Sequence, residues 1–198
     1  MGDLVQEIEI SEDIKFRVFQ DNCVDSPRDW DNLGEMVCWH KRYTLGDKHE
    51  YESPEELLDE ITTDGSIYLP LYLYSHSGIT ISTSPFSCRW DSGQVGFIIM
   101  RLAVIDSEFG GDKDKALKCL ETEVKKYDQY LRGDIYLFQL VRLVTCDHCD
   151  HCDHCDHCDN IDENIVDSCG GFYGFDIEFN GMLEYVSQEY SDIIKDKL

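Results

Sequence analysis

The strongest constraint on the fold is the segment of residues 66–83, which reads SIYLPLYLYSHSGITIST. Its two arms, residues 66–74 and 79–83, are rich in the aromatic and β-branched residues that favour extended strands. The tripeptide His-Ser-Gly at 76–78 supplies small and polar residues typical of a tight turn. The pattern predicts an antiparallel hairpin.

The rest of the chain also consists of strand-like and helix-like segments. Ile14, Phe16 and Val18 alternate with other residues, which predicts a strand with one buried face. The sequence Ser-Pro-Glu-Glu at 53–56 has a capping residue, a first-turn proline and two acids, as helix starts do. Strands are expected at 14–20, 35–44, 66–74, 79–83, 94–104, 134–146 and 164–179, and helices at 53–61, 113–130 and 182–195. The prediction is one α+β domain over residues 1–198, an antiparallel sheet of six or seven strands with about three helices covering one face.

The charge of the chain limits its partners. It contains 41 Asp and Glu against 17 Lys and Arg, a net charge of -24. Such a field repels phosphate backbones and acidic lipid headgroups, so direct binding to nucleic acid or membrane is not expected. The same negative field attracts basic surfaces, which favours a protein partner that normally binds nucleic acid. The alternative is that the acidity only keeps a small protein soluble.

The N-terminal residues lack the basic and apolar regions of a secretory leader, and no apolar run approaches the length of a membrane span. Five of the ten cysteines lie in one short segment and the others are scattered, which is not the pattern of a disulfide framework. These features predict a protein of a reducing cytoplasm. They leave its oligomeric state open.

The triplet Cys-Asp-His repeats over residues 146–160, between two predicted strands, and is expected to be an insertion at a hairpin tip. Cysteine and histidine are the usual zinc ligands. In the polyproline II conformation, however, the period of three would place the cysteines along one edge about 9 Å apart, too far for one ion. A zinc-binding module and a tolerated repeat expansion both stay open. The candidate ligands are Cys146, His148, Cys149, His151, Cys152, His154, Cys155, His157 and Cys158.

A second candidate site lies in the loop SPRDWDNLG, where Arg28, Trp30, Asp31 and Asn32 gather hydrogen-bonding groups around an indole. They are expected to form a ligand or partner surface. The alternative is a structural loop, in which Asp31 and Asn32 bond the backbone and Trp30 fills the core.

Three further residues extend this candidate site. His40 follows Cys38 by two positions, so on a strand both would face the same way as a possible base and nucleophile. His76 lies at the predicted turn and Asp91 precedes Ser-Gly. A pocket formed by Trp30, His40, His76 and Asp91 would make the protein an enzyme or a small-ligand binder. The sequence has no Walker loop, nucleophile elbow, His-Glu-x-x-His or dinucleotide glycine motif, which favours a non-enzymatic function.

Four stretches resemble a family of small, uncharacterised proteins of bacteriophage and prophage genomes: SPRDWDNLGEMVCWHKRYTLGDKH, LPLYLYSHSGITISTSPFSCRWDSGQVGFI, YDQYLRGDIY and DSCGGFYG. Together they span most of residues 16–175. Gly170 stands where this family pattern leads us to expect a tryptophan, and the Cys-Asp-His repeat looks like an elaboration of a variable hairpin. The resemblance carries no catalytic residues, but it implies a phage accessory protein of the bacterial host cytoplasm. The leading hypothesis is a counter-defence protein that binds a host or defence-system protein with a basic surface, as an acidic nucleic-acid mimic.

Overall fold

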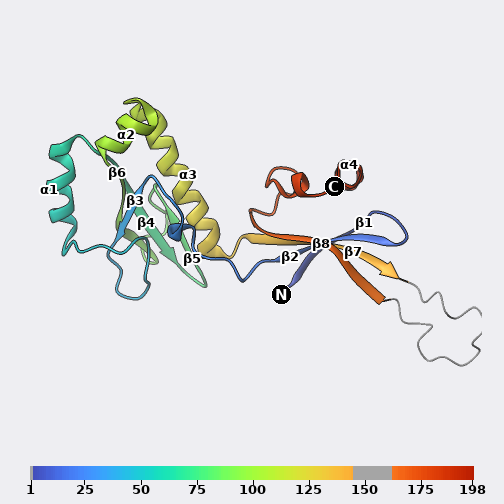
Figure 1. Ribbon diagram of the computed structural model, residues 1–198. Coiled ribbons are helices and arrows are strands. Elements are labelled where there is room, and N and C mark those ends of the chain that lie inside the picture. The colour runs from blue at the N-terminus through green and yellow to red at the C-terminus, as the bar shows by residue number, and fades with distance from the viewer. Residues whose placement is uncertain (1, 145–161) are drawn as a thin grey trace, which may run out of the picture. The chain divides into compact units, whose positions relative to one another are not determined.

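The computed structural model describes residues 2–144 and 162–198, and the chain divides into two compact units. The first unit combines Met1–Val24 with Gly133–Leu198, and the second is Asp25–Arg132. The described residues form eight strands in two antiparallel four-stranded sheets, with four α-helices (Figure 1). The α+β class is therefore confirmed.

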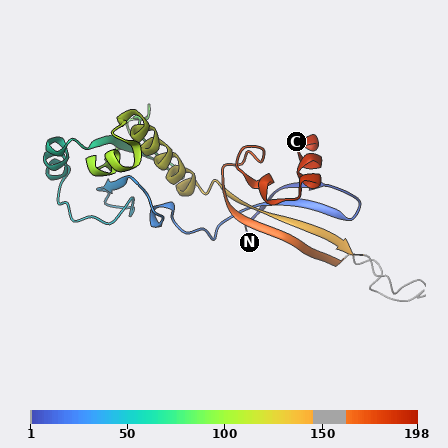
Figure 2. The same ribbon diagram turned by 45° about the horizontal axis from the view of Figure 1, so that its top comes forward.

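The first unit contains a sheet with the strand order β1-β2-β7-β8. Its elements are β1 (Leu4–Glu9), β2 (Ile14–Gln20), β7 (Ile135–Val144), β8 (Asp162–Tyr173), a 3₁₀ turn (Met182–Tyr185) and α4 (Gln188–Lys197). The alternation predicted for β2 is correct: Ile14, Phe16 and Val18 are buried, and the ring of Phe16 stacks on that of Phe138 with centroids 5.3 Å apart. The C-terminal segment, red in Figure 2, packs on this face of the sheet. Its helix α4 contributes Ile194 to the core.

An ion-pair ladder crosses the other face of this sheet. The guanidinium of Arg17 donates to Glu7 on β1 at 2.6 Å and, through two nitrogens, to Glu163 on β8 at 2.6 Å each. Lys15 also reaches Glu7, at 2.8 Å. Hydrogen bonds from Lys15 and Arg17 lower the pKa of Glu7, and the bond from Arg17 lowers that of Glu163. The ladder therefore links β1 and β8, the two edge strands of this sheet, through β2.

The second unit contains a sheet with the order β3-β6-β4-β5, covered by helices on both faces. Its strands are β3 (Glu35–Cys38), β4 (Ile67–Ser75), β5 (Ile79–Ser82) and β6 (Ser92–Met100), and its helices are α1 (Pro54–Asp64), α2 (Leu102–Phe109) and α3 (Lys113–Arg132). In Figure 1, α2 and α3 lie on one side of this sheet and α1 on the other. On β6, Ile98 and Met100 join the core with α2 and α3, whereas Phe97 and Ile99 pack with α1. Burial on both faces explains why β6 is continuously apolar instead of alternating.

Short sequence patterns correctly predict several of these elements. The predicted hairpin is present as β4 and β5, paired antiparallel. At the start of α1, the Ser53 side chain accepts a hydrogen bond from the backbone N–H of Glu56, and the helix ends at Gly65, which has the positive φ of 82° typical of a helix stop. The sequence therefore identifies these elements within a few residues.

Two parts of the fold prediction are wrong. The strands do not form one sheet of six or seven. One sheet contains β1, β2, β7 and β8, although the sequence of the second unit separates β2 from β7. The described residues form four α-helices where about three were expected, and those of the second unit cover both faces of its sheet, not one. Residues 102–104, predicted as the end of the 94–104 strand, begin α2 instead. The apolar run LAVI shows no helical period, so its pattern does not distinguish a helix start from a buried strand. The C-terminal helix is shorter than predicted, because Val186 is extended and α4 begins only at Gln188.

Candidate functional site

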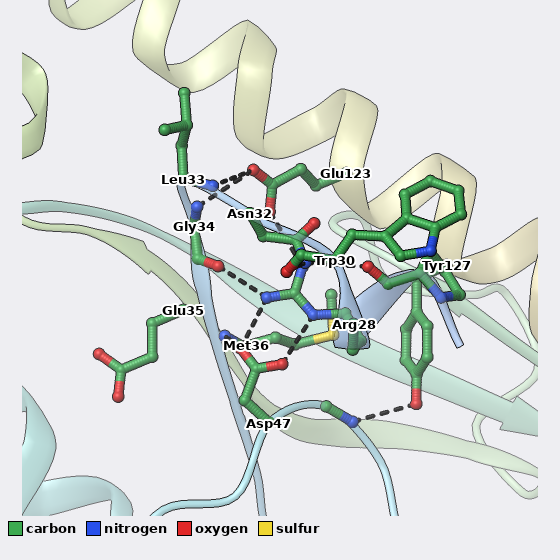
Figure 3. Close-up of polar contacts among 12 residues, drawn as sticks. Arg28, Trp30, Asn32, Leu33, Gly34, Glu35, Met36, Asp47, Glu123 and Tyr127 are labelled. Carbon is green, nitrogen blue, oxygen red and sulfur yellow. Dashed lines mark hydrogen bonds and ion pairs between the residues drawn. The ribbon is translucent and has the colours of Figure 1, made fainter. Parts of the chain in front are cut away.

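Arg28 lies at the centre of a hydrogen-bond network beneath the loop that precedes β3 (Figure 3). The loop makes a 3₁₀ turn at Pro27–Asp29, where the Ser26 side chain accepts a hydrogen bond from the backbone N–H of Arg28. The Arg28 side chain is only 5% exposed. The local turn thus directs a cation into the protein, where it must find acceptors.

The guanidinium of Arg28 finds acceptors on two other segments and on the backbone of its own loop. Its Nε and Nη2 donate to the two oxygens of Asp47, at 2.8 and 2.6 Å. Nη1 donates to Glu123 of α3 at 2.9 Å, and Nη2 also donates to the carbonyl of Gly34 at 2.7 Å. Burial by itself lowers the pKa of Arg28, but the bonds to Asp47 and Glu123 outweigh it and raise this pKa above its usual value. Arg28 is therefore charged and fully engaged inside the protein.

Both carboxylates in the network also bind the backbone. Glu123 Oε1 accepts from the N–H groups of Leu33 and Gly34, at 3.0 and 3.1 Å. Asp47 Oδ2 accepts from the N–H of Met36 at 2.7 Å. The network ties the loop and the first residues of β3 to α3, so it supports a structural role for Arg28 (Figure 3).

Trp30 is presented to solvent above this network. Its side chain is 46% exposed, and the Lys126 ammonium lies 5.4 Å from the centre of the indole ring. The Asn32 amide donates to the carbonyls of Pro27 and Trp30, each at 2.9 Å. Asp31 is exposed. The structural alternative is thus right about Asn32 but wrong about Trp30, which does not fill the core.

His76 and Asp91 lie together at another place in the second unit. His76 Nδ1 is 3.5 Å from Asp91 Oδ2, and the Cys88 thiol lies 3.6 Å from the same oxygen. His40 and Asp91 line one hollow, whereas His76 lines a neighbouring one at the β4–β5 turn. Trp30 and Asp31 line a third hollow, against α3. The predicted residues thus fall into two groups and not into one pocket.

The proposed pairing of Cys38 with His40 does not match the described geometry. β3 ends at Cys38, so the strand alternation does not extend to His40. Cys38 is buried, whereas His40 is exposed and its Nδ1 accepts from the backbone N–H groups of Arg42 and Tyr43, at 3.3 and 3.1 Å. Burial raises the pKa of the Cys38 thiol to about 12, with a further contribution from Asp47. The thiol is therefore protonated at neutral pH and is a poor nucleophile.

We expect Cys38 to resist alkylation in the folded protein. Treatment with iodoacetamide near pH 8, followed by peptide mass spectrometry, should modify the exposed Cys23 quickly and leave Cys38 unmodified until the chain is denatured. Equal rates for the two thiols would contradict this assignment and restore Cys38 as a candidate nucleophile.

All nine predicted zinc ligands, at residues 146–158, lie outside the described residues. Within 2–144 and 162–198, no group of three His, Cys, Asp or Glu side chains is arranged to hold a metal ion. Cys169, which lies outside the repeat, is partly buried against the core and pairs with Phe138 on the neighbouring strand. Zinc binding by the repeat stays a prediction.

Sequence reasoning missed the residues that organise both groups. Asp47 and Glu123 carry no recognisable signal, because their role depends on contacts 19 and 95 residues away from them. Trp90 lies between the strands predicted at 79–83 and 94–104 and belongs to neither candidate site, yet it is 96% exposed. The sequence does indicate this exposure, because a tryptophan that follows an arginine in a polar loop has few apolar neighbours to pack against.

No helix in the described part of the chain is long and apolar enough to cross a membrane. No family model, curated protein or solved structure matches the chain.

Proposed function

We propose that the protein is a non-enzymatic phage accessory or counter-defence protein that binds a host or defence-system protein with a basic surface. The phage context rests on the resemblance of the four sequence stretches given above. The mode of binding is that of a polyanion mimic, in which carboxylates occupy a groove that otherwise holds nucleic acid.

The uneven distribution of charge between the units carries the proposal. The first unit has 21 Asp and Glu against five Lys and Arg, whereas the second has 20 against 12. Two of the five cations of the first unit, Lys15 and Arg17, are already paired with Glu7 and Glu163 in the ion-pair ladder. We define the acidic surface by exposed carboxylates of this unit: Asp162, Asp167, Asp176, Glu178, Glu184, Glu189, Asp192 and Asp196. It is the part of the described protein best suited to a basic partner.

The test uses a first-unit variant with four carboxylates converted to amides, Asp167→Asn, Glu184→Gln, Glu189→Gln and Asp196→Asn. Each of these side chains is exposed, so the fold should tolerate the changes. The matched control removes the same charge from exposed positions of the second unit, Glu50→Gln, Asp59→Asn, Asp106→Asn and Glu121→Gln.

Immobilised wild-type protein is incubated with nuclease-treated bacterial lysate at about 50 mM salt, where electrostatic binding is strong. We expect a discrete protein to be retained, to be released by high salt and by added duplex DNA, and to be lost with the first-unit variant but not with the control. An absence of retained protein at low salt would overturn the proposal. Retention of a protein that duplex DNA does not displace would also overturn it, and so would equal retention by the first-unit variant and the control.

A further inference from the structure

Three loops of the second unit meet at one end of its sheet. Trp90 and Asp91, before β6, line the same hollow as His40, which follows β3. The carbonyl of Asp91 accepts from the backbone N–H of Ser75 at 2.8 Å, which ties the loop before β6 to the end of β4. Ser75 in turn lies 3.1 Å, between hydroxyl oxygens, from Tyr43 in the loop after β3. The three loops therefore form one connected surface.

This surface carries unpaired positive charge in a strongly acidic protein. Lys41 and Arg42 lie in the loop after β3, and Arg89 precedes Trp90. None of the three has a carboxylate partner among the residues that the structure describes. Arg42 instead lies with its guanidinium carbon 5.3 Å from the centre of the Tyr43 ring. Two histidines, His40 and His76, lie on the same loops.

Acidic residues are nearly missing from the segment that supplies the β4–β5 turn and the loop before β6. Residues 65–105 contain a single carboxylate, Asp91, although Asp and Glu make up 41 of the 198 residues overall. His76 stands 3.5 Å from this one carboxylate and Cys88 3.6 Å from it. At physiological ionic strength the Debye length is about 8 Å, so the distant charges of the protein act weakly on a ligand bound here. The local surface, not the net charge of -24, decides what binds.

Trp90 supplies a stacking platform on this cationic surface. Its side chain is 96% exposed, whereas its loop is held by the Ser92 hydroxyl, which donates to the carbonyl of Cys88, and by the bond from Ser75 to Asp91. An exposed indole on a pinned backbone loses little conformational entropy when a ring stacks on it. Hydroxyl groups of Ser75 and Ser92 line the hollow beside it.

We propose that this surface, defined by His40, Lys41, Arg42, His76, Arg89 and Trp90, binds single-stranded nucleic acid. An unpaired base stacks on Trp90, and the flanking phosphates contact Lys41, Arg42 and Arg89. Duplex DNA is disfavoured because its bases are already stacked and paired. An acidic peptide would use the cations but gains little from the indole. The net charge predicts that the protein does not bind nucleic acid; under this proposal, that prediction fails at this one surface.

The first experiment is a titration of fluorescein-labelled dT8 with the full-length protein, followed by fluorescence anisotropy. Neutralising about three phosphates gives a slope of log Kd against log salt of about 2 for a single strand. We expect saturable binding that weakens with this slope and is not competed by a blunt duplex. No binding at low salt would overturn the proposal.

Variants separate stacking from charge. Trp90→Ala should weaken dT8 binding about tenfold, because stacking one base on an aromatic ring typically contributes this much. Trp30→Ala is the matched control, since Trp30 is the other strongly exposed tryptophan and lies against α3, in a different hollow of the unit. The triple variant Lys41→Gln, Arg42→Gln and Arg89→Gln should bring the salt slope close to zero.

Equal affinity of the Trp90→Ala variant and the wild type would sink the proposal. Competition by poly-glutamate as strong as by unlabelled dT8 would show instead a site for acidic peptides. The first-unit carboxylate variant described above should keep dT8 binding, so this result is independent of whether the protein binds a basic partner.

Discussion

Replacing Arg28 with alanine is expected to lower the free energy of unfolding of the second unit by about 3–5 kcal/mol, because it leaves two largely buried carboxylates without their cation. Asp47 and Glu123 then keep their bonds to backbone N–H groups and, for Glu123, a long contact with the Cys119 thiol, in a place where water has limited access. All three tryptophans of the chain lie in the second unit, so urea unfolding followed by tryptophan fluorescence reports on this unit.

The matched control is Lys115→Ala, which removes an exposed ion pair with Asp112 near the start of α3. Exposed pairs of this kind contribute well below about 1 kcal/mol. A loss with Arg28→Ala no larger than with Lys115→Ala would show that the network does not hold the loop. Arg28→Lys should remain strongly destabilising, since an ammonium cannot bind both oxygens of Asp47 in the same plane while reaching Glu123.

The Gly96→Ala substitution is expected to destabilise the second unit by at least about 2 kcal/mol, through steric overlap within the sheet. A Cβ atom at this position would lie 2.0 Å from the carbonyl oxygen of Val37 and 2.8 Å from the Cα of Cys38, both backbone atoms of the paired strand β3. The strand would have to shift to admit the methyl group. Urea unfolding followed by tryptophan fluorescence measures the loss.

Gly93→Ala makes the same chemical change on the same strand, where no atom lies within 4 Å of the added Cβ. We expect this control to be neutral or slightly stabilising, because alanine reduces the freedom of the unfolded chain. Similar stabilities of the two variants would contradict the close approach of β3 to β6.

The sequence predicted elements whose cause is local. The hairpin of β4 and β5, the capped start of α1 and the alternation in β2 each depend on neighbouring residues, and each is present. Partition of the strands into two sheets has no local cause, since Ile14 pairs with Arg142 far along the chain. Pairing preferences of this range cannot be extracted from patterns of a few residues.

The candidate site shows the same division. The turn at Pro27–Asp29 is local, but the direction of the Arg28 side chain depends on Asp47 and Glu123, which the sequence does not mark as its partners. The sequence therefore predicts that Arg28 is available to a ligand, whereas in the structure its guanidinium is bound by Asp47 and Glu123. Trp90 shows the opposite error, because a residue assigned only to a loop is the most exposed large apolar side chain described.

The second unit interrupts the sequence of the first, which has a consequence for biosynthesis. During translation, residues 25–132 can complete their own core while β2 still lacks its neighbour β7, which emerges only later. The two-stranded β1–β2 hairpin is not expected to be stable alone in this interval. The backbone bond from Asp21 to Ile135 forms where the chain re-enters the first unit, so it closes a loop that the folded second unit has already shortened. The order of folding on the ribosome would then run from the inserted unit outward, and the first unit would be the last part of the protein to become native.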